Sequence, residues 1–481
     1  MTTNREDRFA QRGVRAARQT SRRRPRERRG AILVLTAVLI ALLVAMVAFA
    51  VDIGYIVLVR TQLQAAADAA ALACAGTIVQ GTDTAEQQAY LYAGMYKAAG
   101  MPIAREQVEI RFGQWDTSSR RFTPSTSDRT AAEVTVHCTA PLFLGRLLGK
   151  AGFDSEASAV ATFPPRDIML VLDYSGSMCY DSQLRSIGRL GRSAVEANLQ
   201  QMYQELGSPK YGKMTWTPQY ISSSNTTQVL KTLGLNKVAY PYPSGSWSDF
   251  VSYVMTDGTI SQAGYRKKYG YLTWMNYLQA KQAAYSQTPD LWKTSEQPIT
   301  AVKDATDLLV AYLEEHCPAD RLGLSIYTST DGTAILEKSL THEFATVSSI
   351  VRHRQAGHYQ PYTNISAGMK TARLELQNHA RAGVFKLMVL MTDGEANRPG
   401  SVNQAKAAVI TEAQAALQAG IPILTIALGV EADTDLMQQV ADITKGAFFE
   451  IPGGQSVADY EEQLKEVFRR VASDRKLQLV Q

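Results

Sequence analysis

The residues from Ala31 to Val51 form an apolar stretch in which Thr36 is the only polar residue. At a rise of about 1.5 Å per residue, a helix of this length crosses a hydrocarbon core of roughly 30 Å. The apolar character continues past Asp52 to Val59, which is longer than the core of a cleaved signal peptide. We therefore expect a transmembrane helix over residues 31–59. A signal peptide is the alternative. Asp52 lies near the outer end of this helix, close to water, so we expect it to be solvated, with pairing to a partner in the membrane as the alternative.

Basic residues are concentrated before this helix. Residues 1–30 contain eleven Arg against three acidic residues, a net charge of +8, which leaves −3 for the other residues of a chain whose total is +5. The basic character therefore belongs to a tail. Such a tail could bind nucleic acid, but it directly precedes the apolar helix, so we expect no nucleic-acid binding. By the positive-inside rule, we expect this basic tail to lie in the cytoplasm. The sequence thus predicts a single-pass protein of the cell membrane whose C-terminal domain lies outside the cytoplasm.

The segment after the membrane helix predicts a stalk. Residues 60–76 are rich in Ala, which favours helix, so we expect the helix to continue through them. Residues 77–165 show alternating patterns around Val108–Phe112 and Val134–Val136 and a short helical pattern at Leu142–Leu148. We predict a small α+β spacer that ends in a linker at Pro164 and Pro165.

After the basic and the apolar segments, the chain continues with the sequence VDIGYIVLVRTQLQAAADAAALACA. This order of segments and this sequence resemble the start of TadG-like proteins of the tight-adherence (Flp) pilus machinery. The resemblance implies pilus or envelope components as partners. Relatives that are processed carry a Glu soon after the cleavage glycine, whereas Gly30 is followed here by AILVLT. We therefore do not predict cleavage of the prepilin type.

The stretch DIMLVLDYSGSM, Asp167–Met178, predicts a strand that is buried on both faces, because five apolar residues follow one another. Asp173, Ser175 and Ser177 then follow at alternate positions. In an open parallel sheet, ligands bind at the carboxyl ends of the strands. One carboxylate and two hydroxyls are hard oxygen ligands, which favour ions such as Mg²⁺.

Two further residues complete this pattern. Leu387–Met391 predicts a second buried strand that ends at Asp393, and Thr363 lies where a loop turns into an amphipathic helix. An N-cap or a turn is the alternative interpretation of the Asp-x-Ser-x-Ser run taken alone.

Together these residues resemble the metal-ion-dependent adhesion site of von Willebrand factor type A domains. The resemblance implies that Asp173, Ser175, Ser177, Thr363 and Asp393 bind a divalent cation, with Mg²⁺ as the expected ion and Mn²⁺ or Ca²⁺ as alternatives. It also implies that a protein partner supplies an Asp or Glu to the open coordination position.

From Thr300 onward, strand and helix patterns alternate, which predicts an α/β fold with a doubly wound parallel sheet over residues 166–481. The expected strands are Leu322–Tyr327, Leu387–Met391, Ile423–Leu428 and Ala447–Ile451, and the expected helices are Val302–Glu315, Ala345–Arg354, Ile365–His379, Val402–Ala419, Asp435–Thr444 and Tyr460–Ala472.

Residues 179–298 interrupt this pattern. They hold twelve of the 22 Tyr and four of the five Trp, and they predict either an aromatic binding surface beside the metal site or a lobe with its own core.

Other chemistries lack support in the sequence. Neither G-x-G-x-x-G nor G-x-x-x-x-G-K-[ST] occurs, and no serine lies in G-x-S-x-G. The four cysteines would lie outside the cytoplasm, where disulfides can form, and His358 is a candidate rim contact. We predict a metal-dependent protein-binding or adhesion module that is not an enzyme. The alternatives are a membrane-bound hydrolase that uses the same ion and a scaffold in which the metal site is silent.

Overall fold

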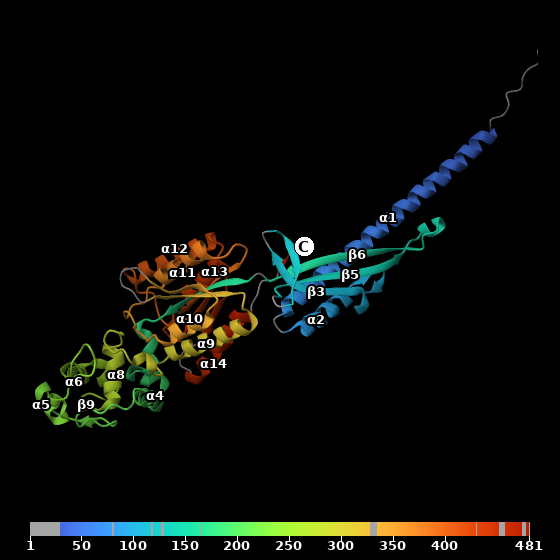
Figure 1. The fold of residues 1–481 in the computed structure, drawn as a ribbon. Coiled ribbons are helices and arrows are strands. Elements are labelled where there is room, and N and C mark those ends of the chain that lie inside the picture. The colour runs from blue at the N-terminus through green and yellow to red at the C-terminus, as the bar shows by residue number, and fades with distance from the viewer. Residues whose placement is uncertain are drawn as a thin grey trace, which may run out of the picture.

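The computed structural model describes residues 29–78, 81–116, 119–126, 129–163, 165–327, 334–429, 431–451, 457–473 and 478–480. They form a long amino-terminal helix, a small sheet domain, an α/β domain and a helical lobe, which follow one another from upper right to lower left (Figure 1). Residues 1–28, which include most of the predicted basic tail, and Pro164 of the predicted linker lie outside the described residues.

The helix α1 runs from Arg29 to Thr77, so the predicted membrane segment and the Ala-rich segment form one helix. Its 49 residues correspond to a length of about 74 Å. Large apolar side chains between Ile32 and Val51 are exposed along its first half. Among the described helices, α1 is the one that is long and apolar enough to cross a membrane.

The second half of α1 is a structural part of the small sheet domain, which we call the stalk domain (residues 60–163 and 478–480). Leu63, Ala67 and Ala70 are fully buried, against α2 (Thr82–Gly94) and one face of the sheet. The small side chain of Ala allows the helix and the sheet to approach closely, and the Ala-rich composition therefore serves packing as well as helix propensity.

The stalk domain contains an antiparallel sheet in the order β15-β6-β5-β3-β4. The predicted strands around Val108 and Val134 are present, whereas the predicted helix over 142–148 is only a 3-10 turn, η3, at the tip of the β5–β6 hairpin. The element bounds are β1 Lys97–Ala98, β2 Met101–Pro102, η2 Arg105–Gln107, β3 Val108–Asp116, β4 Arg121–Pro124, β5 Ala131–Pro141, η3 Gly145–Leu148, β6 Gly152–Thr162 and β15 Gln478–Leu479.

Asp52 corrects one expectation. The side chain is buried, at 8% exposure, and its carboxylate accepts hydrogen bonds from the backbone amides of Phe143, Leu144 and Gly145 at 2.7–3.3 Å. Solvation was the wrong prediction, because the tip of the β5–β6 hairpin folds back onto α1 and supplies the donors that water would otherwise supply.

The end of the chain returns to the stalk domain. Gln478 and Leu479 pair with Thr162 and Ala161 on β6, and the amide of Val480 donates to the carbonyl of Val160 at 2.9 Å. The stretch that we assigned to the C-terminal domain, residues 166–481, therefore ends in a strand of the other sheet.

The α/β domain contains a six-stranded sheet in the order β11-β10-β7-β12-β13-β14. Strand β7 (Arg166–Asp173) lies between β10 and β12, and all eight of its residues are buried, as the continuous apolar run predicted. Strand β11 is antiparallel to β10, so the sheet is mixed at one edge. The other strands are β10 Arg321–Tyr327, β11 Ile335–Thr341, β12 Phe385–Thr392, β13 Ile423–Leu428 and β14 Phe448–Ile451.

Helices cover both faces of this sheet (Figure 1). Ile168 and Leu170 of β7 point into a core with α9, α10 and α14, while Met169 and Val171 point into a second core with α11, α12 and α13. The prediction of an α/β sheet with helices on both faces is thus confirmed. The helices are α9 Ile299–His316, α10 Phe344–Arg352, α11 Ile365–His379, α12 Val402–Gln418, α13 Thr434–Thr444 and α14 Val457–Ser473.

The segment 179–298 forms a helical lobe at the far end of the molecule from α1 (Figure 1). Trp274, Phe250 and Tyr277 lie at the centre of its own apolar core. The elements are η4 Gly176–Ser182, η5 Leu184–Ser186, α3 Ile187–Leu190, α4 Arg192–Glu205, β8 Gln219–Tyr220, α5 Thr226–Leu233, η6 Leu235–Lys237, α6 Trp247–Thr256, α7 Gly258–Gln262, β9 Lys268–Tyr269, α8 Tyr271–Lys281 and η7 Leu291–Lys293.

Candidate metal centre

The carboxyl end of β7 turns sharply around Asp173. The amide of Ser175 donates to Oδ1 of Asp173 at 2.8 Å, which holds the carboxylate over the turn. The hydroxyls of Ser175 and Ser177 lie 2.9 Å apart on the same side of this turn. The alternate spacing in the sequence therefore brings three oxygen-bearing side chains together.

Strand β12 lies beside β7, and its end supplies the second carboxylate. The hydroxyl of Ser177 donates to Oδ1 of Asp393 at 2.6 Å. Because the proton of Ser177 is used in this bond, Ser175 is the donor in the contact between the two serines. Asp173, Ser175, Ser177 and Asp393 thus form one hydrogen-bonded chain across two neighbouring strand ends.

Thr363 lies in the loop before α11 and is buried, at 3% exposure. Its amide donates to Oδ1 of Asn397 at 2.9 Å, while the carbonyl of Pro361 accepts from the amide of Gly176 at 3.3 Å. The Thr363 loop is therefore tied to both strand-end loops. The five predicted residues lie at one edge of the sheet.

The two carboxylates are in an unfavourable electrostatic environment. Burial raises the pKa of Asp173, and burial together with the neighbouring charge of Asp173 raises the pKa of Asp393 well above its usual range. In the described part of the chain, no Lys or Arg forms an ion pair with either group. The site thus contains two buried acids without an ion-paired side-chain cation.

This donor set fits a hard divalent cation. The hydrogen-bonded residues offer two carboxylates and two hydroxyls, and the hydroxyl of Thr363 in the neighbouring loop would add a third. All are oxygen, the ligand type that Mg²⁺ and Ca²⁺ prefer. A cation between the acids would compensate their mutual repulsion. The described residues contain no group of three or more His, Cys, Asp or Glu side chains suited to a metal, so the hydroxyls are essential to any such site.

A family model matches most of the α/β domain. Residues 292–463 match the family model of the von Willebrand factor type A domain. The C-terminal domain is a von Willebrand factor type A domain. The match begins within the last residues of the helical lobe, so it omits β7 and the Asp-x-Ser-x-Ser run. In space, however, β7 occupies an interior position of the type A sheet, between β10 and β12. The lobe interrupts the type A domain directly after its first strand.

The amino-terminal part matches two other family models. Residues 30–77 match the Flp pilus-assembly TadE/G-like family, and residues 59–161 match the Tad-like Flp pilus-assembly family. The chain therefore joins a TadE/G-like segment to a type A domain, and this confirms the resemblance seen in the sequence. The combination supports a role in adhesion or pilus assembly, which is a non-enzymatic role.

The solved structures that this chain matches are distant in sequence. An aerotolerance-related membrane protein from Bacteroides fragilis is 14% identical, with 36% of this chain and 90% of that chain covered and a TM-score of 0.28. BatB from Bacteroides thetaiotaomicron is 17% identical, with the same coverages and a TM-score of 0.28. The pilus adhesin SpaC from Lactobacillus rhamnosus is 11% identical, with 76% of this chain and 35% of that chain covered and a TM-score of 0.31. No curated protein matches in sequence.

Two residues that support the site were not predicted. Thr392 donates through its hydroxyl to Oδ2 of Asp173 at 2.8 Å, and the hydroxyl of Tyr327 donates to the carbonyl of Met391 at 2.5 Å. Both residues end strands that neighbour β7. The position of Thr392 directly before Asp393 is the one signal in the sequence that could have suggested its role.

The lobe begins directly beside the candidate metal centre, but its aromatic residues are mostly internal. Tyr285 stacks on His358, with ring centroids 4.8 Å apart, next to the loop that carries Thr363. His358 is itself buried, so it packs against the lobe instead of forming an open rim. Of the two expectations for this segment, the structure favours a lobe with its own core.

The four cysteines do not form disulfides. Cys74, Cys138, Cys179 and Cys317 are all buried, and none of them is bonded to another cysteine. Burial raises the pKa of the Cys74 thiol to about 12 and that of Cys179 well above its usual range. The disulfides that the predicted location would permit are therefore not present, and the thiols serve as small apolar side chains.

Proposed function

We propose that this chain is a membrane-anchored, outward-facing module that binds a protein partner through a divalent cation, with Mg²⁺ as the expected ion. The observation that carries the proposal is the pair of buried carboxylates, Asp173 and Asp393, which have hydroxyl neighbours and no ion-paired cation in the described residues. Asp173, Ser175, Ser177, Thr363 and Asp393 would hold the ion. The ion would then accept an Asp or Glu side chain of the partner at its open position.

The anchor in this proposal is the first half of α1. Its exposed side chains from Ile32 onward are apolar, which is costly in water and favourable in lipid. The basic residues that precede it in the sequence would keep the amino terminus in the cytoplasm. This arrangement presents the stalk domain, the type A domain and the lobe on the outer side of the membrane, where pilus or envelope components are available.

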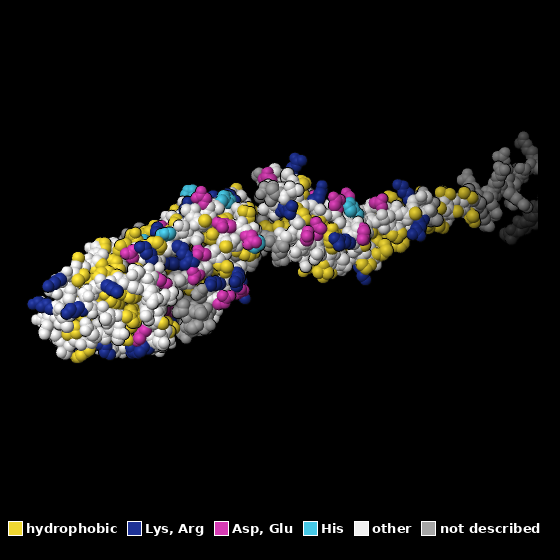
Figure 2. Space-filling view, turned by 60° about the horizontal axis from the view of Figure 1, so that its bottom comes forward, with side chains coloured by type: hydrophobic (Ala, Val, Ile, Leu, Met, Phe, Trp, Pro, Cys, Tyr) yellow, Lys and Arg dark blue, Asp and Glu magenta, His cyan; other side chains and the backbone are white. Residues whose placement is uncertain are grey.

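The charge of the lobe supports an acidic partner. Residues 179–298 carry twelve Lys and Arg against seven Asp and Glu, although the chain from residue 31 onward is net negative. Basic side chains are visible at the outer end of the lobe in Figure 2. A partner that offers a carboxylate to the ion would also be attracted by these charges, which increases the rate of encounter.

The experiment that tests the proposal is a calorimetric titration of the full-length chain in detergent with Mg²⁺ and Mn²⁺. We expect saturable binding that is lost in Asp173→Ala and in Thr363→Ala. Matched controls are Asp290→Ala, a surface carboxylate of the lobe, and Thr411→Ala, an exposed hydroxyl on α12. Thermal unfolding of each variant shows whether it is folded. Absence of binding in the unmutated chain, or equal binding in Asp173→Ala, would contradict the proposal.

A further inference from the structure

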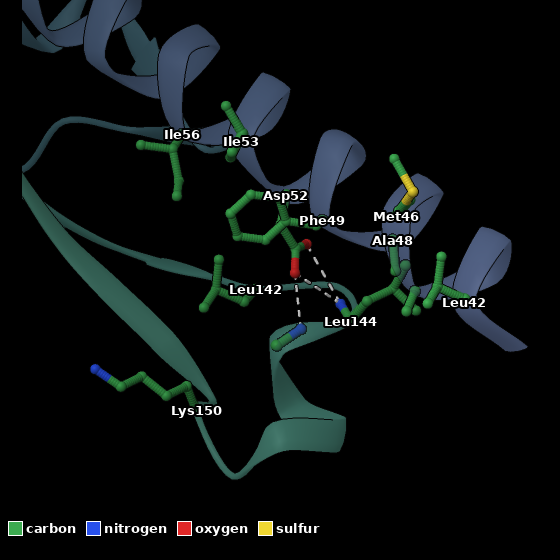
Figure 3. Close-up of a pocket in the computed structure, with 12 residues that line it drawn as sticks. Leu42, Met46, Ala48, Phe49, Asp52, Ile53, Ile56, Leu142, Leu144 and Lys150 are labelled. Carbon is green, nitrogen blue, oxygen red and sulfur yellow. Dashed lines mark hydrogen bonds between the residues drawn. The ribbon is translucent and has the colours of Figure 1, made fainter.

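A cavity lies between the first half of α1 and the tip of the β5–β6 hairpin (Figure 3). It has a volume of about 750 Å³, and its walls are mainly apolar. The main contributors are Leu42, Met46, Phe49 and Ile53 from α1 and Leu142 and Leu144 from the hairpin tip. The cavity is therefore formed by a helix that we propose to cross the membrane and by a loop of the stalk domain.

The position of the cavity along α1 fixes its depth. A hydrocarbon core of roughly 30 Å takes about 20 helical residues, which extend from Ile32 to about Val51. The cavity follows α1 from Leu42 to Ile56, so part of it lies at the depth of the outer leaflet. Exposed apolar side chains continue to Leu58, and moving α1 inward to immerse them would place the hairpin tip still deeper.

Backbone groups of an irregular loop at this depth must find partners within the protein. The tip meets this requirement. The amides of Phe143, Leu144 and Gly145 donate to the carboxylate of Asp52, as Figure 3 shows for Leu144. At the other end of the tip, the amide of Gly149 donates to the carbonyl of Arg146, and the amide of Lys150 donates to that of Gly145. Asp52 thus allows this turn to enter an apolar medium.

The side chains of the tip are amphipathic in the manner of a membrane surface element. Phe143 is 58% exposed, and its ring makes an edge contact with the ring of Tyr55 at a centroid distance of 4.7 Å. Arg146 and Lys150 are exposed on the same short loop. Apolar side chains flanked by basic ones fit the boundary between acyl chains and phosphate headgroups.

We propose that the hairpin tip, residues 142–150, is a second membrane-embedded element, and that the cavity holds an acyl chain of a phospholipid whose phosphate contacts Arg146 and Lys150. This inference rests on the proposed membrane anchor. Phospholipid is the occupant that the site favours, because the cavity is continuous with the exposed apolar surface of α1 and one cation, Lys150, lines it. The helix of a partner protein is the competing occupant.

The first test measures depth in the bilayer. Full-length protein in phospholipid nanodiscs is labelled with a polarity-sensitive fluorophore at Phe143→Cys, Val38→Cys or Tyr220→Cys, and quenched by lipids with spin labels on their acyl chains. The native cysteines are buried, so the introduced cysteine takes the label. Val38 lies on α1, and Tyr220 is a similarly exposed aromatic residue of the lobe.

We expect quenching at residue 143 to match that at residue 38, with none at residue 220. Quenching at residue 38 while residue 143 behaves as residue 220 would overturn the inference and leave the anchor intact. Absence of quenching at residue 38 would overturn the anchor, and the inference with it.

The second test identifies the occupant. Nanodiscs are made with a phospholipid that carries a photoactivatable group on its acyl chain, and labelled peptides are identified by mass spectrometry. We expect labelling of peptides that contain Phe49 and Leu144, and loss of it in Ala48→Trp, which fills the cavity, with labelling around Leu35 unchanged. Labelling around Leu35 without labelling at Leu144 would show that another molecule fills the cavity and would overturn the proposal.

A third measurement examines the positioning role of Asp52 by amide hydrogen exchange in nanodiscs. We expect Asp52→Ala to remove the protection of residues 143–145 and the quenching at residue 143, and Asp52→Asn, which keeps one acceptor oxygen, to retain part of both. Unchanged protection in Asp52→Ala would contradict this role.

Discussion

At the scale of single residues, Asp173 and Asp393 differ from the other buried acids of the type A domain. Asp320 is paired with Arg166, and Asp167 is paired with Arg321 and Arg381. Asp173 and Asp393 have hydroxyl and amide donors instead. Since buried charges are normally paired, the two unpaired acids indicate a position where a cation from solution can be accepted.

Replacement of Asp393 by Asn therefore has opposite effects with and without metal. Removing one of two repelling charges is expected to stabilise the metal-free chain by about 1–2 kcal/mol, because the isosteric amide still accepts from Ser177. The stabilisation by Mg²⁺ is expected to disappear. Thermal unfolding with and without Mg²⁺ measures both effects, with Asp290→Asn as control. A metal-free variant less stable than the unmutated chain would refute the expectation.

Asp167 provides a pH-dependent prediction. Burial alone would raise its pKa, but hydrogen bonds and charge from Arg321 and Arg381 outweigh burial and lower the pKa. The stabilisation from this group is therefore complete above about pH 4, the unfolded value, and is lost as the pH falls through the lower folded value.

Asp167→Asn is expected to cost about 3 kcal/mol at neutral pH, because it leaves two arginines without their partner. It should also flatten the loss of stability in acid. Unfolding curves between pH 3 and pH 7 test this prediction. Parallel pH dependences of the variant and the unmutated chain would show that Asp167 does not contribute in this way.

At the scale of helices and strands, the sequence predicted those elements whose residues are buried in a regular pattern. The expected bounds of β13 and α11 agree with the structure, because each has a clear apolar period and a clear end. Strand β11 was missed because it is a half-exposed edge strand without strict alternation. The short helices of the lobe were missed because Gly, Pro and Ser lie between them and their aromatic contacts are not periodic.

Asp173, Ser175, Ser177 and Asp393 of the candidate metal site could be anticipated from strand ends, since parallel neighbours bring their ends together. Thr363, which precedes a helix, was added through the resemblance to type A domains. The contacts that support these residues could not be anticipated. The bond from Thr392 to Asp173 depends on β12 lying next to β7, and the bond from Asp52 to the hairpin tip spans 91 positions. Local periodicity in the sequence predicts neither the order of strands in a sheet nor a contact between residues that are so far apart along the chain.

The independent core of the lobe leads to a prediction about Trp274. This side chain is 1% exposed and contacts Trp247, Phe250 and Tyr277. Trp274→Ala is expected to destabilise the lobe by about 3–5 kcal/mol. Hydrogen exchange should show loss of protection in α6 and α8, while β7 and β12 stay protected. Loss of protection throughout the type A sheet would show that the two cores unfold together.

At the scale of the whole molecule, the type A domain is joined to the stalk domain at two points, through the residues after β6 and through the pairing of β15. Stopping the chain after Ser473 removes the second point. We expect Mg²⁺ binding to be unchanged and the distribution of distances between labels at Thr123 and Thr411 to broaden, as measured by electron spin resonance. The substitution Leu479→Ala, which keeps the strand, is the control. An unchanged distribution would mean that β15 does not restrain the domains.

The two attachment points also determine how the molecule responds to torque. The chain enters the type A domain after β6 and returns from it as β15, and these two strands are adjacent at the edge of the stalk sheet. Turning the type A domain about the long axis of the molecule would therefore wind the two connections around each other. Tilting the domain in the plane that separates them requires no winding. A pull on a bound partner is therefore expected to tilt the domain about these two connections without rotating it, so the face with the candidate metal centre would keep its direction relative to the proposed anchor.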